Sequence, residues 1–161
     1  MHSLGILGVG ELTEKVVIGL RRSGFEGPIL LSPRNAQRAA LLAQEHGCQV
    51  LPSNQAVVDQ ADLVILGVRP HSLAELADEL HLRPGQRLVS LAAGVNFAQL
   101  STAFPGALCV RAMLSYAAQY NQSTVVVAHP MRSPPSTWGH WANWWCCTAS
   151  QNSNWPPWRR V

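Results

Sequence analysis

The feature that most constrains this chain is a glycine-rich turn close to its N-terminus. Residues 5–10 read Gly-Ile-Leu-Gly-Val-Gly, after an apolar strand-like start and before a segment with helical spacing. Gly8 allows a tight turn out of a strand, and Gly10 lets the backbone approach a phosphate without a Cβ in the way. The helix that begins near Glu11 directs its free N–H groups and the positive end of its dipole at the same point. Strand, turn and helix together predict a dinucleotide-binding βαβ unit.

One position departs from this fingerprint. Its third glycine, or the usual alanine substitute, is Thr13 here. A hydroxyl and a methyl are bulkier at the helix–strand contact, so we expect somewhat looser packing there. An ordinary glycine-rich turn is the alternative interpretation of the same segment. The residues predicted to contact the cofactor at this turn are Gly8, Val9, Gly10, Glu11 and Leu12.

The end of the next predicted strand indicates which dinucleotide binds. An NAD site has an Asp or Glu there to bond the ribose 2′-hydroxyl, but residues 31–35 (Leu-Ser-Pro-Arg-Asn) contain no acid. Ser32, Arg34 and Asn35 offer donors and a positive charge to a 2′-phosphate, and arginine can bind it with two hydrogen bonds. The segment therefore favours NADP(H). The alternative for Arg34 is a solvated residue at the start of a helix.

Strand-like and helix-like segments alternate along residues 1–112 with short connections. This alternation predicts an α/β fold with a Rossmann-like, doubly wound, mostly parallel sheet. The predicted strands are residues 3–7, 28–32, 48–51, 63–68, 87–91, 108–111 and 123–128. The predicted helices are residues 11–22, 35–46, a segment capped by Ser53, 72–82 and 97–103.

Charge, hydropathy and cysteines exclude several classes of function. Up to residue 130 nine basic residues balance nine acidic ones, and the three further arginines form no phosphate-tracking stripe, so no nucleic-acid partner is expected. Apolar runs are far shorter than the roughly 20 residues of a membrane helix. Without a signal-peptide pattern, a cytoplasmic location is expected. Cys48 and Cys109 are expected to be buried. The adjacent Cys146 and Cys147 are poorly placed for joint metal ligation, so no metal site is predicted.

Five short motifs, in this order, resemble the N-terminal half of the pyrroline-5-carboxylate reductases over about residues 3–130. They are Gly5-Ile6-Leu7-Gly8-Val9-Gly10, Ser53-Asn54, Leu66-Gly67-Val68-Arg69-Pro70, Ser90-Leu91-Ala92-Ala93-Gly94-Val95 and Val110-Arg111-Ala112-Met113. The resemblance implies that Asn54 lies near the adenosine end of the cofactor. It also implies a set of residues on the nicotinamide side, namely Val68, Arg69, Pro70, Ala92, Ala93 and Gly94.

The resemblance also implies an activity: NADPH-dependent reduction of 1-pyrroline-5-carboxylate to proline, with hydride passing to the C=N carbon. Two departures stand out. Arg69 replaces the usual Lys, and Leu-Ser-Tyr-Ala follows Met113 where the family has Pro-Asn-Thr-Pro. Another cyclic imine is therefore an alternative substrate. A non-catalytic NADP-binding module, or the NADP domain of a β-hydroxyacid-dehydrogenase-like family, is an alternative to the enzyme.

The family's helical domain binds the imino acid and forms a homo-oligomer, and no segment of this chain matches it. We therefore expect the chain to be mainly the cofactor-binding half, poorly active alone. No catalytic residue is assigned, because His71 is better explained as a residue at the start of a helix.

The character of the sequence changes after residue 130. Residues 131–161 contain all six tryptophans, no acid, no Leu and no Ile, and show no period of 2 or 3.6. We expect an irregular or disordered tail there, and an NADP-binding domain over residues 1–130. One hypothesis is a frameshift that truncated the enzyme, since back-translation of residues 140–161 in another frame permits a family-like peptide. A Trp-rich binding tail is the alternative, and sequencing the gene distinguishes the two.

Overall fold

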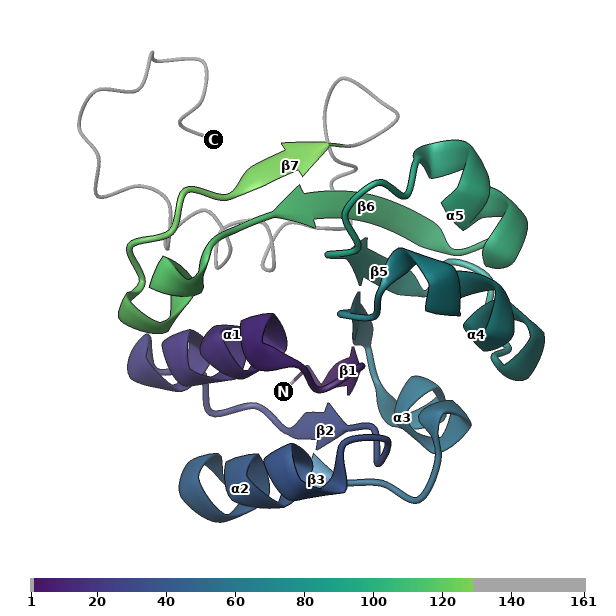
Figure 1. The fold of residues 1–161 in the computed structure, drawn as a ribbon. Helices are drawn as coiled ribbons and strands as arrows, with labels where there is room; N and C mark the ends of the chain where they lie inside the picture. Colours follow the sequence, from purple (N-terminus) through teal and green to yellow (C-terminus); the bar gives the residue numbers. More distant parts are fainter. Residues whose placement is uncertain (1, 129–161) are drawn as a thin grey trace.

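A computed structural model describes residues 2–128 and shows an α/β fold with helices on both faces of one sheet (Figure 1). Within that range seven strands pair in the order β3-β2-β1-β4-β5-β6-β7. The pairs from β3 to β6 are parallel, and β7 is antiparallel to β6. The predicted mostly parallel, Rossmann-like sheet is confirmed. The predictions for residues 131–161 lie outside the described residues.

The elements follow the predicted alternation closely. The strands are β1 Leu4–Leu7, β2 Ile29–Leu31, β3 Gln49–Val50, β4 Leu63–Leu66, β5 Arg87–Ser90, β6 Leu108–Met113 and β7 Val126–Ala128. The α-helices are α1 Glu11–Arg22, α2 Ala36–His46, α3 Asn54–Gln60, α4 Leu73–Glu79 and α5 Phe97–Ala103. Two short 3-10 helices are η1 Pro70–Ser72 and η2 Tyr116–Tyr120.

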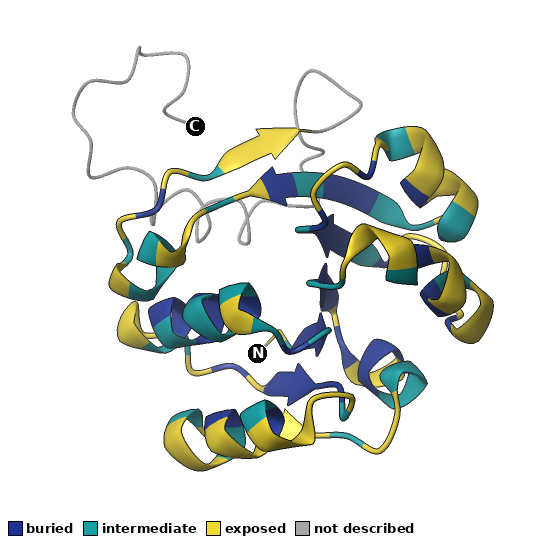
Figure 2. Ribbon diagram, in the orientation of Figure 1, coloured by how far each residue is buried: buried dark blue, intermediate teal, exposed yellow. Residues whose placement is uncertain are grey.

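Successive strand residues enter two separate apolar clusters, one on each face of the sheet. In β4, Leu63 and Ile65 join the cluster that α1 and α2 cover. Val64 and Leu66 join the cluster that α3, α4 and α5 cover. Figure 2 shows the central strands as buried and the outer helix faces as exposed. Burial on both faces explains why these strands are continuous apolar runs without alternation.

Both cysteines in the described range are buried, as predicted. Cys48 is 6% exposed and Cys109 is 7% exposed. Burial raises the pKa of each thiol to about 11. They are therefore small apolar core residues. Among the described residues no helix is long and apolar enough to cross a membrane.

The fold differs from prediction mainly at the end of α4. Helical spacing predicts a helix through residue 82, but α4 ends at Glu79 and Leu80 is extended. The cause is a tertiary contact from α3. The Gln55 Oε1 accepts the His81 N–H at 2.9 Å, and the Gln55 Nε2 donates to the His81 carbonyl at 3.1 Å. The Gln55 amide thus forms hydrogen bonds with both the N–H and the carbonyl group of His81. These two backbone groups are therefore not used to continue the helix.

A second difference is η2, which follows β6 and was not predicted. It packs on α1 at Gly19, where a Cβ would lie 2.1 Å from the Ala118 carbonyl oxygen. The Arg22 guanidinium stacks on the Tyr120 ring at 5.2 Å and donates to the Gln119 carbonyl at 2.9 Å. The segment after Met113 therefore lies along α1.

Candidate functional site

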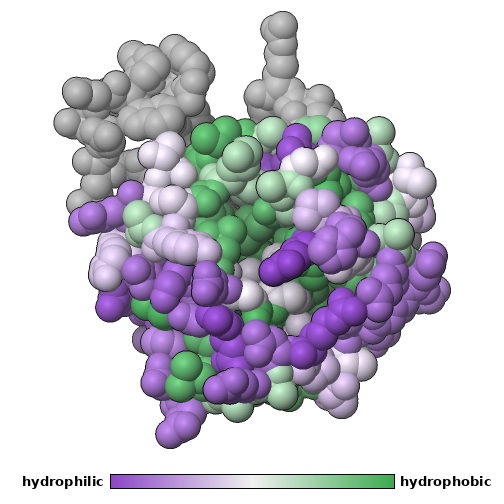
Figure 3. All heavy atoms as spheres, in the orientation of Figure 1, coloured by the Kyte–Doolittle hydropathy of each residue, from purple (hydrophilic) through white to green (hydrophobic). Residues whose placement is uncertain are grey.

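The predicted cofactor residues lie at the edge of the sheet where the parallel strands end. The order of strands reverses between β1 and β4, and open α/β sheets bind ligands at such a switch point. Figure 3 shows a hollow near the middle of this view, with hydrophobic and neutral residues inside it and hydrophilic residues along its lower and right borders. The residues predicted from the sequence to contact the cofactor follow the strands in turn. They are Gly8, Val9, Gly10, Glu11 and Leu12 after β1, Ser32, Arg34 and Asn35 after β2, Asn54 in α3, Val68, Arg69 and Pro70 after β4, and Ala92, Ala93 and Gly94 after β5.

Residues 8–12, the glycine turn, are held between the ends of β2 and β4. Gly8 has a φ of 85°, and a Cβ there would lie 2.7 Å from Val68 Cγ1 and 3.0 Å from the Gly67 backbone. The Gly8 N–H donates to the buried Ser32 hydroxyl at 3.0 Å. Positive φ and the close approach both require glycine. Val9 packs in the core at 3% exposure, so only its backbone borders the turn.

Gly10 is the position of the turn that has space in front of it. It is the N-cap of α1, with a φ of −103°, and apart from Gly10 itself and its two chain neighbours no atom of the described residues lies within 4 Å of the place its Cβ would take. The amide groups of Glu11 and Leu12 belong to the first turn of α1, where N–H groups have no partner within the helix. Free space, unpaired amides and the positive end of the helix dipole suit an anion.

Thr13 does not loosen the fold in the way we expected from the sequence. It is 1% exposed, and its Oγ1 accepts the Gly10 N–H at 2.8 Å and lies 3.0 Å from the Gly8 and Gly10 carbonyl oxygens. Its methyl group fits because Gly67 has no Cβ, which would lie 2.3 Å from Thr13 Cγ2. The helix–strand contact still needs one small residue. Here that residue is Gly67, just after β4, and not the third position of the fingerprint, which is Thr13.

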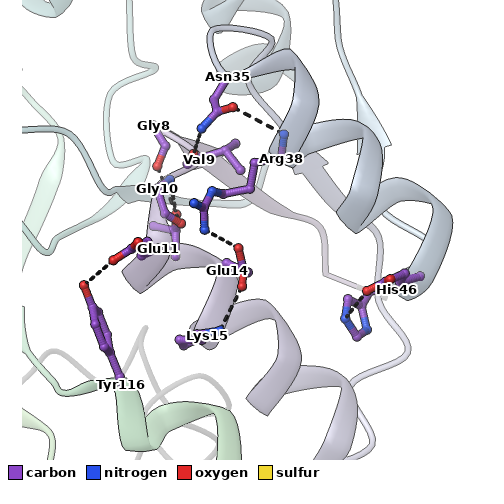
Figure 4. A network of polar contacts seen from close by, with 12 residues as sticks. Gly8, Val9, Gly10, Glu11, Glu14, Lys15, Asn35, Arg38, His46 and Tyr116 are labelled. Carbon is purple, nitrogen blue, oxygen red and sulfur yellow. Dashed lines mark hydrogen bonds and ion pairs between the residues drawn. The ribbon is translucent and has the colours of Figure 1, made fainter.

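Polar contacts tie α2 to the glycine turn (Figure 4). The Asn35 Nδ2 donates to the Val9 carbonyl at 3.0 Å, and its Oδ1 accepts the Arg38 N–H at 3.3 Å. Below them Glu14 is paired with Arg38 and with Lys15. Burial alone would raise the pKa of Glu14, but the Lys15 hydrogen bond and the two positive charges bring that pKa below its usual value.

Of the three residues predicted to bind a 2′-phosphate, Arg34 is the accessible cation. Its side chain is 56% exposed, and its Nη2 lies 3.0 Å from both carboxylate oxygens of Glu75 in α4. Ser32 is fully buried against the turn, and Asn35 uses its amide on the turn and on α2. Direct contacts of Ser32 and Asn35 with a cofactor stay predictions.

Asn54 is placed next to α4 in the same manner as Arg34. Its Nδ2 lies 3.1 Å from both carboxylate oxygens of Glu79. Sequence reasoning missed Glu75 and Glu79, although they are four residues apart and so share one face of a helix. That spacing is visible in the sequence, but nothing local indicates that the face meets Arg34 and Asn54. We name these four residues, Arg34, Asn54, Glu75 and Glu79, the charged rim.

The residues predicted for the nicotinamide side follow β4 and β5. Arg69 and Pro70 are exposed at the start of η1, and His71 is exposed within η1. Ala93 and Gly94 are exposed, and Gly94 has a φ of 77°. Ala92 is buried at 7% exposure. Because β4 and β5 pair in parallel, residues 68–70 and residues 92–94 follow neighbouring strands at the same edge of the sheet. The resemblance implied this placement, whereas the spacing of the two motifs in the sequence did not establish it.

The segment that departs from the family's pattern also reaches the site. The Tyr116 hydroxyl in η2 donates to the Glu11 carboxylate at 2.9 Å (Figure 4). This hydrogen bond, together with the negative charge, raises the pKa of Tyr116. Sequence reasoning missed the contact, because 105 residues separate the two partners. Among the described residues no group of three or more His, Cys, Asp or Glu could hold a metal ion.

Three comparisons with known proteins agree with this geometry. The family described as "NADP oxidoreductase coenzyme F420-dependent" matches residues 3–94. Pyrroline-5-carboxylate reductases from Pseudomonas aeruginosa and Glycine max are 33% identical over 100 residues and 30% identical over 133 residues. The crystal structure of 1-pyrroline-5-carboxylate reductase from Streptococcus pyogenes matches 92% of this chain with a TM-score of 0.79 and 25% identity.

These relatives are considerably longer than this chain. The matches cover 60% and 79% of this chain but 37% and 48% of the two relatives. The match to the Streptococcus pyogenes structure covers 56% of that protein. This chain therefore spans about half the length, or less, of the proteins it is similar to.

Proposed function

This chain belongs to the family described as "NADP oxidoreductase coenzyme F420-dependent", and from that membership we propose that it is the NADPH-binding part of a pyrroline-5-carboxylate reductase. The proposed reaction reduces the C=N bond of 1-pyrroline-5-carboxylate to give proline. The relatives that carry this name support the substrate. The proposed NADP-binding domain spans residues 1–130. The family and the mostly parallel fold agree with the cofactor expected from the sequence, NADP(H).

One observation carries the proposal: the open space at Gly10 faces the switch point between β1 and β4. Apart from Gly10 itself and its two chain neighbours, no described atom lies within 4 Å of the Gly10 Cβ position, whereas Gly8 two residues earlier is tightly enclosed. The fold by itself does not require glycine at a negative φ in open space, because Asn, Asp and Ser cap a helix slightly better than glycine. A pyrophosphate that approaches the backbone supplies the reason.

The residues around that space would hold the cofactor in an extended form along the strand ends. The amides of Glu11 and Leu12 would bind the pyrophosphate, and Arg34 would bind the 2′-phosphate. The segments at Arg69 and Gly94 would border the nicotinamide. When bound, NADPH supplies the hydride, and the chain's own part is to orient it and exclude water.

Replacement of Gly10 by alanine tests the binding site. The φ of −103° and the free space allow the methyl group in the fold, so stability should fall by only about 1 kcal/mol, the usual difference between N-cap residues. NADPH binding should weaken about ten-fold or more, because the methyl group occupies the phosphate's place. Calorimetric titration of the full chain with NADPH measures the effect.

The matched control is Gly24→Ala at the other end of α1. Gly24 has a φ of 85°, and apart from Gly24 itself and its two chain neighbours no described atom lies within 4 Å of its Cβ position, so alanine should cost about 1–2 kcal/mol of stability through backbone strain alone. Its NADPH affinity should stay that of the wild type. Wild-type affinity in Gly10→Ala would contradict the proposed site, and equal losses in both variants would indicate destabilisation instead.

Substrate turnover is tested separately, by proline formation from the imine with NADPH. Because the chain spans about half of its relatives, we expect binding with little or no turnover. Turnover of a different cyclic imine would overturn the proposed substrate and keep the cofactor site. Failure to bind NADPH would overturn the proposal altogether.

A further inference from the structure

The charged rim contains an ion pair that joins two separate parts of the proposed cofactor site. Arg34 follows β2, and Glu75 lies in the first turn of α4, which follows β4. Nη2 of Arg34 contacts both oxygens of Glu75 at 3.0 Å, and the two side chains are 56% and 65% exposed. The pair is therefore open to solvent and contributes little to the stability of the fold.

A second contact shows that α4 as a whole lies against this part of the site. Glu79 lies one helical turn after Glu75. The Asn54 Nδ2 donates to both carboxylate oxygens of Glu79 at 3.1 Å. Both polar side chains predicted at the adenosine end, Arg34 and Asn54, thus meet carboxylates from one face of one helix. The Glu75 carboxylate therefore reaches Arg34 from the same helix face that contacts Asn54.

We propose that Glu75 is a specificity-determining residue that competes with the 2′-phosphate of NADP(H) for Arg34 and so reduces the preference for NADPH over NADH. This inference rests on the proposed function. A guanidinium binds phosphate and carboxylate through the same donors. The 2′-phosphate of NADPH must therefore displace Glu75 from Arg34 or share Arg34 with it. The phosphate dianion is also repelled by the negative charge of Glu75. NADH has a neutral hydroxyl at the 2′-position, so its binding does not depend on an ion pair with Arg34.

Replacement of Glu75 by glutamine isolates the competition. Glutamine keeps the size and the helix but removes the charge that holds Arg34. An exposed ion pair changes an equilibrium by up to about five-fold, so NADPH should bind about two- to five-fold more tightly. NADH binding should stay unchanged. The gain should shrink at high salt, where exposed charges are screened.

The matched control is Asp78→Asn, which removes the same charge from an exposed position of the same helix. Its ratio of NADH to NADPH dissociation constants should be that of the wild type. Addition of Arg34→Ala distinguishes competition from simple repulsion, because without Arg34 the substitution of Glu75 should lose most of its effect. Calorimetric titrations of the full chain with NADPH, NADH, 2′,5′-ADP and 5′-AMP measure all of these, and 2′,5′-ADP against 5′-AMP isolates the 2′-phosphate.

The outcomes separate this inference from the proposed function. The inference is supported if Glu75→Gln, but not Asp78→Asn, raises the preference for NADPH over NADH and for 2′,5′-ADP over 5′-AMP. This rise should disappear when Arg34 is also replaced by alanine. Wild-type binding of NADPH with an unchanged ratio in Glu75→Gln overturns the inference and leaves the proposed function intact. An equal rise in Asp78→Asn also overturns it, because the effect would then be general charge. Binding of neither dinucleotide by any variant overturns both.

Discussion

The glycine turn and the charged rim lie at the same edge of the sheet but are held in different ways. The turn is determined by steric contact: Gly8 meets Val68 and the Gly67 backbone, and its amide bonds a fully buried hydroxyl. The charged rim is held by exposed pairs between long side chains, as between Arg34 and Glu75. Close packing permits one geometry, whereas exposed ion pairs exchange partners at little cost.

This difference separates the two tasks of a dinucleotide site. Every dinucleotide has a pyrophosphate, so the part that binds it can be rigid. The 2′-position distinguishes NADP from NAD, and in the proposed site Arg34, a residue that can change partners, would adjust the preference there. Substitutions at the enclosed positions Gly8 and Gly67 should therefore act mainly on stability, and substitutions in the charged rim mainly on which cofactor binds.

The largest effect is expected from Gly67→Ala, which acts on the turn. The added Cβ would lie 2.3 Å from Thr13 Cγ2 and 2.9 Å from the Gly8 carbonyl oxygen, so the free energy of unfolding should fall by about 3 kcal/mol, the upper range for overpacking. Thr13→Ser removes the clashing methyl and keeps the hydroxyl. The double variant should be more stable than additivity predicts. Urea denaturation measures each value, and strict additivity would show that the methyl group is not the obstacle.

The next effect is expected from Arg34→Ala, which acts on the charged rim. Loss of charged hydrogen bonds costs about 1.5–3 kcal/mol, so NADPH should bind about ten-fold or more weakly, with NADH nearly unaffected. Stability should change by less than about 1 kcal/mol, because the Glu75 pair is exposed. Titration with both cofactors provides the check. Equal weakening of NADPH and NADH would show that Arg34 does not recognise the 2′-phosphate.

A smaller effect is expected from Glu14→Gln, beneath the turn. The folded-state pKa of Glu14 lies below its ordinary value, so the carboxylate stabilises the fold above the unfolded pKa of about 4.3, and this contribution is lost as the pH falls through the folded pKa. The variant should be less stable by about 1 kcal/mol at pH 7, a typical value for hydrogen-bonded charges. The gap should narrow as the pH is lowered from 7 through the folded pKa, where the carboxylate takes up its proton. Denaturation over a series of falling pH values tests this, with exposed Glu26→Gln as the control.

The smallest effect is expected at the cysteines, which report on the two faces of the sheet. Cys48 belongs to the cluster under α1 and α2, and Cys109 to the opposite cluster. With each pKa raised to about 11, both thiols should resist alkylation at pH 8 until the protein opens. Peptide-resolved mass spectrometry follows each site. In Gly67→Ala, labelling should increase, and fast labelling of the wild type would contradict the burial.

Much of the fold was predictable because strand and helix patterns are local. α1 and α5 have the predicted bounds, Ser53 caps α3 by accepting the Ala56 N–H, and Gly47 ends α2 with a φ of 61°. The early end of α4 was not predictable, because it depends on Gln55 from another helix. Gly19 within α1 is explained only by η2, which packs against it from 97 or more residues along the chain.

For the candidate site, the sequence by itself determined the turn, the order of the motifs and the absence of an acid after β2. These are properties of single segments, each of which has its own chemistry. Only the tertiary structure showed that Thr13 packs against Gly67. It also showed that the Ser32 hydroxyl accepts the Gly8 N–H and that Glu75 forms an ion pair with Arg34. Such pairs join strand ends that are far apart in the chain, and only the order of strands in the sheet brings them within a few ångströms of each other.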